Sequence, residues 1–332
     1  MRHLSISIVL AVLMSMVGEK TSANGIAINR IYYLLTADTA TVTYYASDGN
    51  NAVAYFGDIV IPEKVTYNNK EYRVTWIGDK AFYKCAGITS ISLPSGIRGI
   101  NENAFYECKS LQSIIIPEGV SVIRRYTFKQ CESLSKVKLP STLRRIEEHA
   151  FSCCYSLSTI DLNDELEYIY GAGIFGGCPL NNIVIPKNVK MIYGNDNNPN
   201  YYDSGNNTYY RTFADVRFDY IITKTLSTKF SPTINAIFDN AALYHAILYV
   251  PIGTWKDAAY GSWWPFHHIQ EMAIETEELS ETQAYSLVNL ETSENVYYDK
   301  VNDDVSSQSI HQDLSASNLN NLSFASAQLL RL

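Results

Sequence analysis

Residues 111–133 read LQSIIIPEGVSVIRRYTFKQCES, and residues 134–156 read LSKVKLPSTLRRIEEHAFSCCYS. The two stretches have the same length, and each places a proline, a phenylalanine and a cysteine at the same positions. Leucine, isoleucine or valine fills further matching positions. Such a match indicates an internal repeat, and a period of about 20–50 residues predicts stacked supersecondary units rather than independent domains.

The same columns extend to both sides of these stretches with a constant step, the one that separates Pro94 from Pro117. Pro140 and Pro186 keep this step, and Asn163 takes the place between them. The last phenylalanine and cysteine come one residue late, and a shorter interval to Pro186 restores the register. The aromatic and thiol columns are Phe82, Phe105, Phe128, Phe151 and Phe175, and Cys85, Cys108, Cys131, Cys154 and Cys178.

Each part of the repeat predicts a local structure. The Ile-x-Ile pair alternates with period two, as in a short strand with one buried face, and the following proline ends that strand. A shorter extended segment comes next, and Ala-Phe-x-x-Cys predicts one helical turn whose phenylalanine points inward. No single unit buries its own apolar stripe, so stacked units must share a core. The sequence therefore predicts a leucine-rich-repeat solenoid, rich in β-structure with short helical turns.

The N-terminal segment has the pattern of a secretory signal peptide. Arg2 and His3 precede the apolar run 4–17, and residues 21–23 offer small side chains for cleavage. The apolar run is too short to span a bilayer comfortably. We therefore expect an exported protein, on the cell surface or secreted, with no integral membrane span in the mature chain.

The chain on either side of the repeats divides by composition. Alternating segments at 28–35 and 39–45, and a hairpin around Asn68-Asn69, predict a β-cap over the first coil. The expected division is a signal peptide at 1–23, an N-terminal β-cap at 24–76, leucine-rich repeats at 77–192, an Asn/Tyr-rich insertion at 193–212, a C-terminal cap of the array at 213–274, and a flexible, acidic, Ser/Asn-rich tail at 275–332.

The charge of the chain is unevenly distributed. The formal net charge is −8, but residues 271–332 hold 11 acidic residues against Lys300 and Arg331. The rest of the chain is therefore close to neutral. A negative net charge of the whole chain argues against a nucleic-acid partner.

The repeat also carries a family resemblance. The stretch GINENAFYECKSLQSI at residues 99–114 resembles the repeat of BspA-like surface proteins, found mainly in Bacteroidetes. Residues 57–82 resemble the lead-in of that family, and residues 248–254 with 264–269 resemble its C-terminal cap. The likeness covers about residues 24–274 and departs from the family at Asn163, at 171–177 and at 193–212. It implies adhesin-like binding to host, matrix or other bacterial proteins.

The six cysteines invite a disulfide framework in an exported protein. Five of them occupy one inward column, and five in a row cannot all pair among themselves. We therefore expect buried free thiols, with disulfides as the alternative. One cysteine per repeat gives none of the paired spacings that zinc needs, and no catalytic or phosphate-binding motif is present. We expect no enzyme, no metal and no cofactor.

The remaining candidates are outward side chains on the coils. Ladders on the main sheet and an arginine group on the second face suit contact with a protein, because solenoids bind macromolecules through extended faces. The alternative is that these are ordinary solvated positions. The candidate residues are Ser92, Ile115, Lys136, Lys138, Asp161 and Val184 on the main sheet, and Arg98, Arg124, Arg144 and Arg145 on the second face.

The sequence therefore favours an exported, non-enzymatic protein that recognises or adheres to other proteins through an extended solenoid face. We expect a monomer whose partner is a protein of the host, the matrix or another bacterial surface. The alternative is a structural scaffold or spacer of the cell envelope with no specific ligand on the repeats.

Overall fold

The computed structural model describes residues 21–22, 25–44, 55–194, 202–203, 208–209, 211–226, 228–231, 237–238, 240–261, 263, 266–273 and 298–299. The chain forms two units, residues 1–299 and 300–332, and the described residues belong to the first. Residues 1–20 of the predicted signal peptide, most of the predicted insertion and nearly all of the predicted tail lie outside the described residues.

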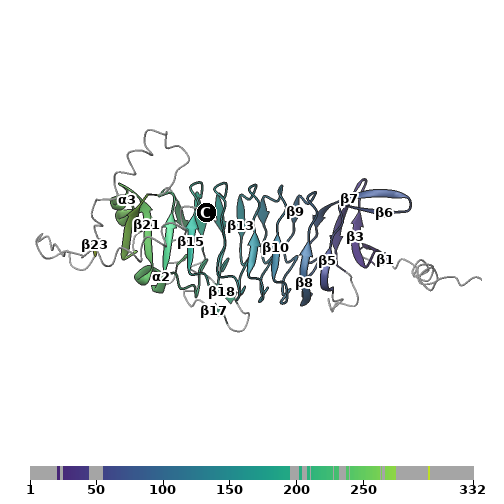
Figure 1. Ribbon diagram of the computed structural model, residues 1–332, viewed down its shortest axis with the longest axis horizontal. Coiled ribbons are helices and arrows are strands. Elements are labelled where there is room, and N and C mark those ends of the chain that lie inside the picture. The colour runs from purple at the N-terminus through teal and green to yellow at the C-terminus, as the bar shows by residue number, and fades with distance from the viewer. Residues whose placement is uncertain are drawn as a thin grey trace, which may run out of the picture. The chain divides into compact units, whose positions relative to one another are not determined.

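One side of the stacked coils is a long sheet of 12 strands (Figure 1). Its strands from β7 onward run parallel, one per coil, whereas β1, β2, β3 and β4 form antiparallel hairpins at the N-terminal end and β6 pairs with β7. The strands are β1 (Thr21–Ser22), β2 (Gly25–Ile28), β3 (Ile31–Leu35), β4 (Thr39–Thr43), β6 (Lys64–Tyr67), β7 (Lys70–Ile77), β9 (Gly99–Ile100), β11 (Val122–Ile123), β13 (Arg145–Glu147), β14 (Tyr168–Tyr170), β16 (Met191–Tyr193) and β20 (Lys229–Ser231).

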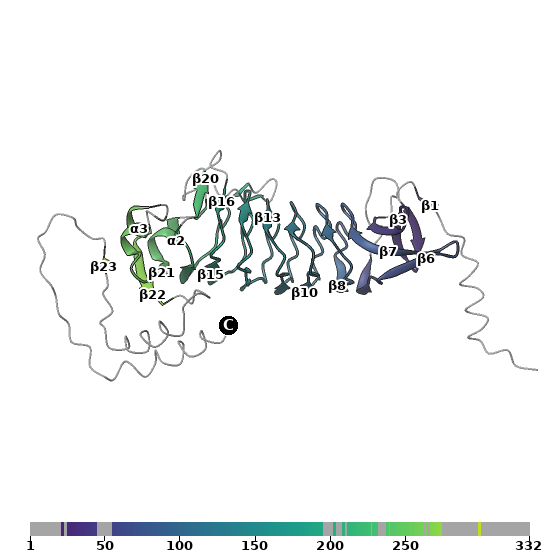
Figure 2. The same ribbon diagram turned by 90° about the horizontal axis from the view of Figure 1, so that it is seen from above.

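The opposite side of the coils carries two shorter sheets, the β5–β12 sheet and the β15–β23 sheet (Figure 2). The first is all parallel, and the second is parallel except for its last pair. The strands are β5 (Phe56–Val60), β8 (Gly87–Ser92), β10 (Ser113–Ile115), β12 (Lys136–Lys138), β15 (Asn182–Ile185), β19 (Tyr220–Thr223), β21 (Ile247–Pro251), β22 (His268–Met272) and β23 (Tyr298–Asp299).

The other elements are short. The helices α2 (Asn240–His245) and α3 (Trp255–Tyr260) flank β21, and β17 (Tyr202–Asp203) pairs with β18 (Thr208–Tyr209) as a separate antiparallel ribbon. The parallel sheets and scarce helices confirm the predicted β-rich leucine-rich-repeat solenoid.

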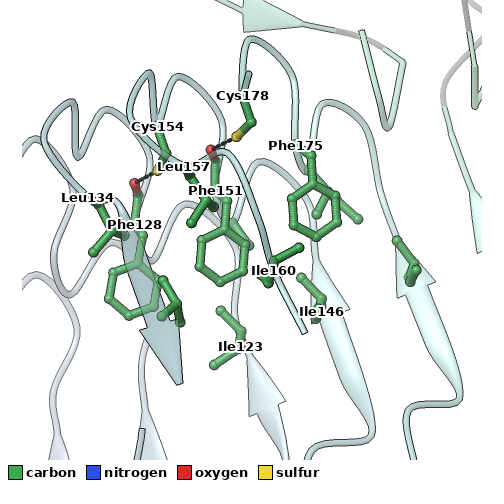
Figure 3. Close-up of a cluster of buried hydrophobic side chains, with 14 of the residues drawn as sticks. Ile123, Phe128, Leu134, Ile146, Phe151, Cys154, Leu157, Ile160, Phe175 and Cys178 are labelled. Atoms are coloured by element: carbon green, nitrogen blue, oxygen red, sulfur yellow. Dashed lines mark hydrogen bonds between the residues drawn. The ribbon is translucent and has the colours of Figure 1, made fainter. Parts of the chain in front are cut away.

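A ladder of stacked phenylalanine rings forms the centre of the core (Figure 3). Successive ring centroids from Phe82 to Phe175 lie 5.3, 5.3, 5.4 and 5.6 Å apart, and the rings are nearly parallel. Tyr55 closes the N-terminal end edge-on at 5.0 Å from Phe82. The ladder continues past residue 192 through Phe213 and Phe238, with separations of 5.4 and 5.1 Å. The 213–238 region thus adds rungs to the same core.

The Ala-Phe-x-x-Cys segments are hydrogen-bonded turns, not the helical turns that the sequence predicted. Asn103 and Glu107, at the two ends of one turn, have φ of 57° and 55°. These left-handed residues direct backbone N–H groups at the next coil, so Phe105 donates to the carbonyl of Thr127 at 2.9 Å. An α-helical turn would keep such bonds inside its own coil. Bonds to the next coil therefore alternate with bonds inside the turn, such as that from the Tyr106 N–H to the Asn103 carbonyl at 3.1 Å, and the turn does not continue as an α-helix.

The N-terminal hairpins follow the sequence in one place and depart from it in another. Asn68 and Asn69 have φ of 49° and 60° and join β6 to β7 in a tight turn, as predicted. The segment 28–35, expected as one strand, breaks at Asn29 and Arg30, which also have positive φ. Tyr33 and Ile26 instead face each other across the antiparallel β2–β3 pair. The alternation of apolar residues through 28–35 did not indicate this turn.

Glycine accommodates the late phenylalanine of the fifth unit. Gly171 has a φ of 133°, and a Cβ built there would lie 2.5 Å from the Cβ of Glu148 in the preceding coil. No larger residue fits this close approach without displacing the backbone. Phe175 still stacks on Phe151, so the extra residue is absorbed in the turn and the core register is kept.

Candidate functional site

Four of the ten candidate residues gather on the outer face of the β5–β12 sheet. Ser92 ends β8, Ile115 ends β10, and Lys136 and Lys138 begin and end β12. All four are exposed, and strand register places Ile115 beside Lys138. Their neighbours on the strands, such as Val137, point inward. The alternation of a pleated strand therefore produces this face directly from the sequence.

Asp161 and Val184 do not share that sheet. Asp161 is exposed but lies in a coil segment that forms no strand, so the β5–β12 sheet stops at β12. Val184 lies on β15, in the neighbouring sheet, and is only partly exposed. In the coil between them, the Asn163 side chain donates to the carbonyl of Pro140 at 2.7 Å and accepts from the Glu165 N–H. Asn163 thus turns the chain where proline ends the other strands.

The structure adds β5, a strand from which no candidate residue was predicted. Phe56, Asp58 and Val60 lie on β5 and face outward beside β8, and Val60 pairs in register with Ser92. The exposed fractions are 73% for Phe56, 68% for Val60 and 66% for Ile115. We call the outer surface of β5, β8, β10 and β12 the β5–β12 face. Its residues are Phe56, Asp58, Val60, Ser90, Ser92, Ser113, Ile115, Lys136 and Lys138.

A signal for β5 was present in the sequence. Residues 59–62 read IVIP and repeat the pattern of residues 91–94, which read ISLP. The interval between their prolines is longer than the step of the other columns because the β6–β7 hairpin is inserted in the same coil. A search for the strand motif without a fixed period would have extended the ladder to β5.

The charges on the β5–β12 face are ordered along the stack. The Asp58 carboxylate accepts hydrogen bonds from the Ser90 hydroxyl at 2.6 Å and the Thr89 hydroxyl at 2.9 Å, and these bonds lower its pKa. At the other side of the face, Lys136 and Lys138 form no ion pair within the described part of the chain. The face thus runs from a carboxylate on β5, across serines and an isoleucine, to two ammonium groups.

Arg145 begins β13 of the long sheet, and the other three arginine candidates are adjacent in sequence to its strands β9, β11 and β13. This sheet lies on the opposite side of the coils from the β5–β12 face (Figure 2). Two of the four form ion pairs. Arg144 reaches Glu165 at 2.9 Å, and Arg145 lies 3.8 Å from Glu147 and 5.5 Å from the Tyr168 ring. Their acidic partners follow later in the sequence, where periodicity does not reveal them.

Arg98 and Arg124 differ from these two. Arg98 is exposed and Arg124 half-buried, and neither has an ion-pair partner among the described residues. The neighbouring Arg125 lies 3.7 Å from Glu102 and 3.8 Å from Glu148. The side chains on this side therefore form mostly internal ion pairs, and the two predicted candidate groups are separate surfaces.

All six cysteines are buried free thiols. Cys154 and Cys178 donate to the carbonyls of Phe128 and Phe151 in the preceding coil, both at 3.2 Å (Figure 3). Cys131 donates in the same way to the carbonyl of Phe105 at 3.1 Å. Burial raises the pKa of the Cys85 thiol to about 11 and raises the pKa values of Cys108, Cys131 and Cys154 as well. The thiol column is therefore part of the core.

The thiol column gives a testable prediction. Because the reactive species is the thiolate and the sulfur atoms are buried, we expect the folded protein to react with a chromogenic disulfide reagent about 1,000-fold more slowly than the unfolded protein. Unfolding in guanidinium should release all six thiols. A thiol of the folded protein that reacts at the unfolded rate would contradict the burial of the column.

Histidine and acidic side chains form no metal centre in the described part of the chain, where no group of three His, Cys, Asp or Glu residues is placed to hold an ion. His267 stacks on Tyr244 with 4.3 Å between the ring centroids, and the neighbouring His268 is exposed at the start of β22. The candidate functional site in the described part of the chain is therefore an extended surface.

The fold and its repeated core define a leucine-rich-repeat protein. Residues 75–198 match the family model described as a BspA type leucine rich repeat region, in six copies. This segment is therefore a leucine-rich-repeat region of BspA type, which confirms the resemblance drawn from residues 99–114.

Several solved structures are similar. A leucine-rich repeat protein from Bacteroides ovatus ATCC 8483 is 25% identical, with 74% of this chain and 76% of that chain covered and a TM-score of 0.42. A leucine rich cell surface protein from Faecalibacterium prausnitzii A2-165 is 20% identical, with 77% of each chain covered and a TM-score of 0.41. A leucine-rich repeat protein of T. pallidum is 19% identical, with 82% of this chain and 96% of that chain covered and a TM-score of 0.35. No curated protein matches the chain.

Proposed function

We propose that this is an exported, non-enzymatic protein of the cell surface or the medium that recognises or adheres to other proteins through the β5–β12 face. The observation that carries the proposal is the group Phe56, Val60 and Ile115 on one sheet. Single exposed apolar side chains are common, but a patch of several with a polar rim is typical of a contact surface. The serine side chains between them are small, so a partner can approach the sheet closely.

The remaining features of the proposal rest on the sequence. The predicted signal peptide supports export, and within the described residues no helix is long and apolar enough to cross a membrane. The formal charge of −8 disfavours nucleic acid, so the partner class is protein. The protein acts as a monomer, without cofactor or metal.

A charge placed at Ile115, on one of the two inner strands of the face, should weaken capture of the partner. We expect Ile115→Asp to weaken binding at least 10-fold, since the aspartate must be desolvated in the contact, and a loss of about 1.4 kcal/mol corresponds to that factor. Purified mature protein is immobilised and exposed to host matrix proteins and to bacterial cells, and the affinity is measured by surface plasmon resonance.

Ile252→Asp provides the matched control. Ile252 is 56% exposed and lies in the turn after β21, away from the face. It should leave binding unchanged. Equal binding by wild type and the Ile115→Asp variant, or no saturable binding by wild type to any of these probes, would refute the proposed use of the face.

The alternative function is a structural scaffold or spacer of the cell envelope. The ion pairs Arg144–Glu165 and Arg145–Glu147 favour it for the long sheet, because arginines satisfied internally have less to offer a ligand. On this alternative, an Ile115→Asp strain keeps every surface phenotype of the wild type, whereas deletion of the whole repeat array does not.

A further inference from the structure

Among the described residues, β5 is an edge strand, paired on one side only. The long sheet continues past β7 with β4, β3, β2 and β1, whereas the sheet on the opposite side stops at β5. In the part of the chain that the structure describes, β5 pairs only with β8. One edge of β5 therefore has backbone N–H and C=O groups with no partner strand, the arrangement that accepts an added strand.

The surroundings of β5 are more open than those of the strands behind it. Inward residues such as Ile88 and Ile114 are 0% and 2% exposed, but Gly57 and Ile59, the inward residues of β5, remain half-exposed. A Cβ built on Gly57 meets no described atom within 4 Å. The inner side of β5 is thus less covered than the inner sides of the strands behind it, although Ile59 still packs against the core.

The outward side chains of β5 indicate what an added strand would carry. Phe56 and Val60 flank Asp58 at positions i, i+2 and i+4, and both apolar side chains are more than half exposed. The hydrogen bonds from Ser90 and Thr89 stabilise the ionised form of Asp58. Cross-strand pairs of apolar residues and of opposite charges stabilise a sheet, and like charges opposite each other destabilise it.

A second copy of this chain fits the edge poorly. Antiparallel self-pairing of two β5 strands about their centres would place Asp58 opposite its own symmetry mate and bring two carboxylates together. The same charge favours a basic residue in a different protein. Asp58 therefore selects a heterologous strand over a copy of β5.

We propose that the free edge of β5 accepts an extended segment of a partner protein as an added strand, with a basic residue opposite Asp58 and apolar residues beside Phe56 and Val60. This deepens the proposed function and rests on it, since the occupant is a segment of the protein partner. Main-chain hydrogen bonds provide the affinity, and the alternating side chains provide the selection.

The test uses a labelled peptide, Ser-Gly-Val-Thr-Lys-Thr-Val-Gly-Ser, and a twin with Glu in place of Lys, with binding to the mature protein followed by fluorescence anisotropy. We expect saturable binding with about a 3-fold preference for the Lys peptide, as exposed charge pairs on sheets give. In the Asp58→Lys variant the preference should reverse in favour of the Glu peptide. Asp219→Lys, an exposed aspartate beside β19, is the matched control and should keep the wild-type preference.

Methylation of the peptide backbone separates strand addition from side-chain contact. Peptides N-methylated at both Thr residues or at the central Lys lose opposite sets of main-chain donors, and one of the two should bind at least 10-fold more weakly. Equal binding by both methylated forms, no reversal in Asp58→Lys, or no saturable binding of either parent peptide overturns the proposal.

The outcomes for β5 and for the face are distinguishable. Peptide addition at β5 uses main-chain groups, so Ile115→Asp should leave peptide affinity within 2-fold of wild type. Loss of partner capture in Ile115→Asp with no peptide binding at β5 retains the proposed function and removes only the added strand. Peptide binding that follows Asp58 while no natural partner is captured removes the proposed function of the face.

Discussion

Phe128→Ala should destabilise the protein by about 3–5 kcal/mol, the usual cost of truncating a fully buried phenylalanine. The ring is 0% exposed and stacks between Phe105 and Phe151 at 5.3 and 5.4 Å, so its removal leaves a cavity with ring faces on both sides. The ladder prevents collapse, because the coil spacing is held by parallel strands on both sheets. Urea unfolding monitored by circular dichroism measures the loss.

Phe56→Ala is the matched control for this prediction. It removes the same atoms from a side chain that is 73% exposed and should change the free energy of unfolding by less than about 0.5 kcal/mol. Since a solenoid is stabilised by contacts between neighbouring coils, the Phe128→Ala variant should also unfold less cooperatively, with the coils on the two sides separating in the denaturation curve. Equal stability of the two variants would contradict a continuous aromatic core.

The core was predictable because every coil repeats the same contacts. Phe105, Phe128 and Phe151 each stack on the equivalent residue of the next coil, so one column of the sequence describes one line of contacts in space. The ladder beyond Phe175 was not predicted, since Phe213 and Phe238 do not fall on the constant step of the earlier columns. Insertions change the spacing along the chain but not the distance between stacked rings.

The turns were less predictable than the strands. Tyr126, His149 and Cys153 all have positive φ, which residues other than glycine rarely adopt and which the residue types alone do not indicate. Bonds between neighbouring coils stabilise these conformations, as when His149 donates its N–H to the carbonyl of Ala172 at 2.9 Å. These bonds exist only when coils are stacked, so the sequence of a single repeat does not predict them.

The candidate surface was predictable in its alternation and not in its extent. Ile115 and Lys138 were placed outward by period two, and the structure has both exposed. The pairing of Arg144 with Glu165 depends on where two flexible side chains meet, and column positions do not specify it. The inclusion of β5 depended on an inserted hairpin that broke the fixed period.

His149 is a buried histidine whose environment the repeat pattern does not reveal. It occupies the position of Tyr126 in the next coil, two residues before the phenylalanine column, and stacks on that ring at 5.2 Å. It is only 2% exposed, and its Nδ1 has no hydrogen-bond partner among the described residues. Burial, with the nearby charges of Lys129 and Arg125, lowers its pKa from 6.5 to about 3. A hydrogen bond with the backbone of Gly173 raises the pKa of His149 but does not offset the desolvation.

This depressed pKa should make the fold acid-sensitive. Between pH 6.5 and pH 3 the unfolded state binds a proton on His149 that the folded state does not, so stability is fully present above pH 6.5 and falls as the pH falls through this window. Lowering the pH from 7 to 5 should cost about 2 kcal/mol through this residue alone. His149→Asn should remove that dependence, and Asn103 already occupies the equivalent position with a φ of 57°.

Urea unfolding at pH 7, 6 and 5 measures how steeply the free energy of unfolding changes with pH. Because this slope is compared, a lower starting stability of the His149→Asn variant does not obscure the result. His267→Asn is the matched control, because His267 also stacks on a tyrosine but is half-exposed, and it should keep the wild-type slope. If His149→Asn loses as much stability between pH 7 and pH 5 as the wild type does, then His149 is not the buried base of the stack. If the free energy of unfolding becomes independent of pH between 7 and 5 in the His149→Asn variant alone, the acid sensitivity in this range comes from the imidazole ring of His149.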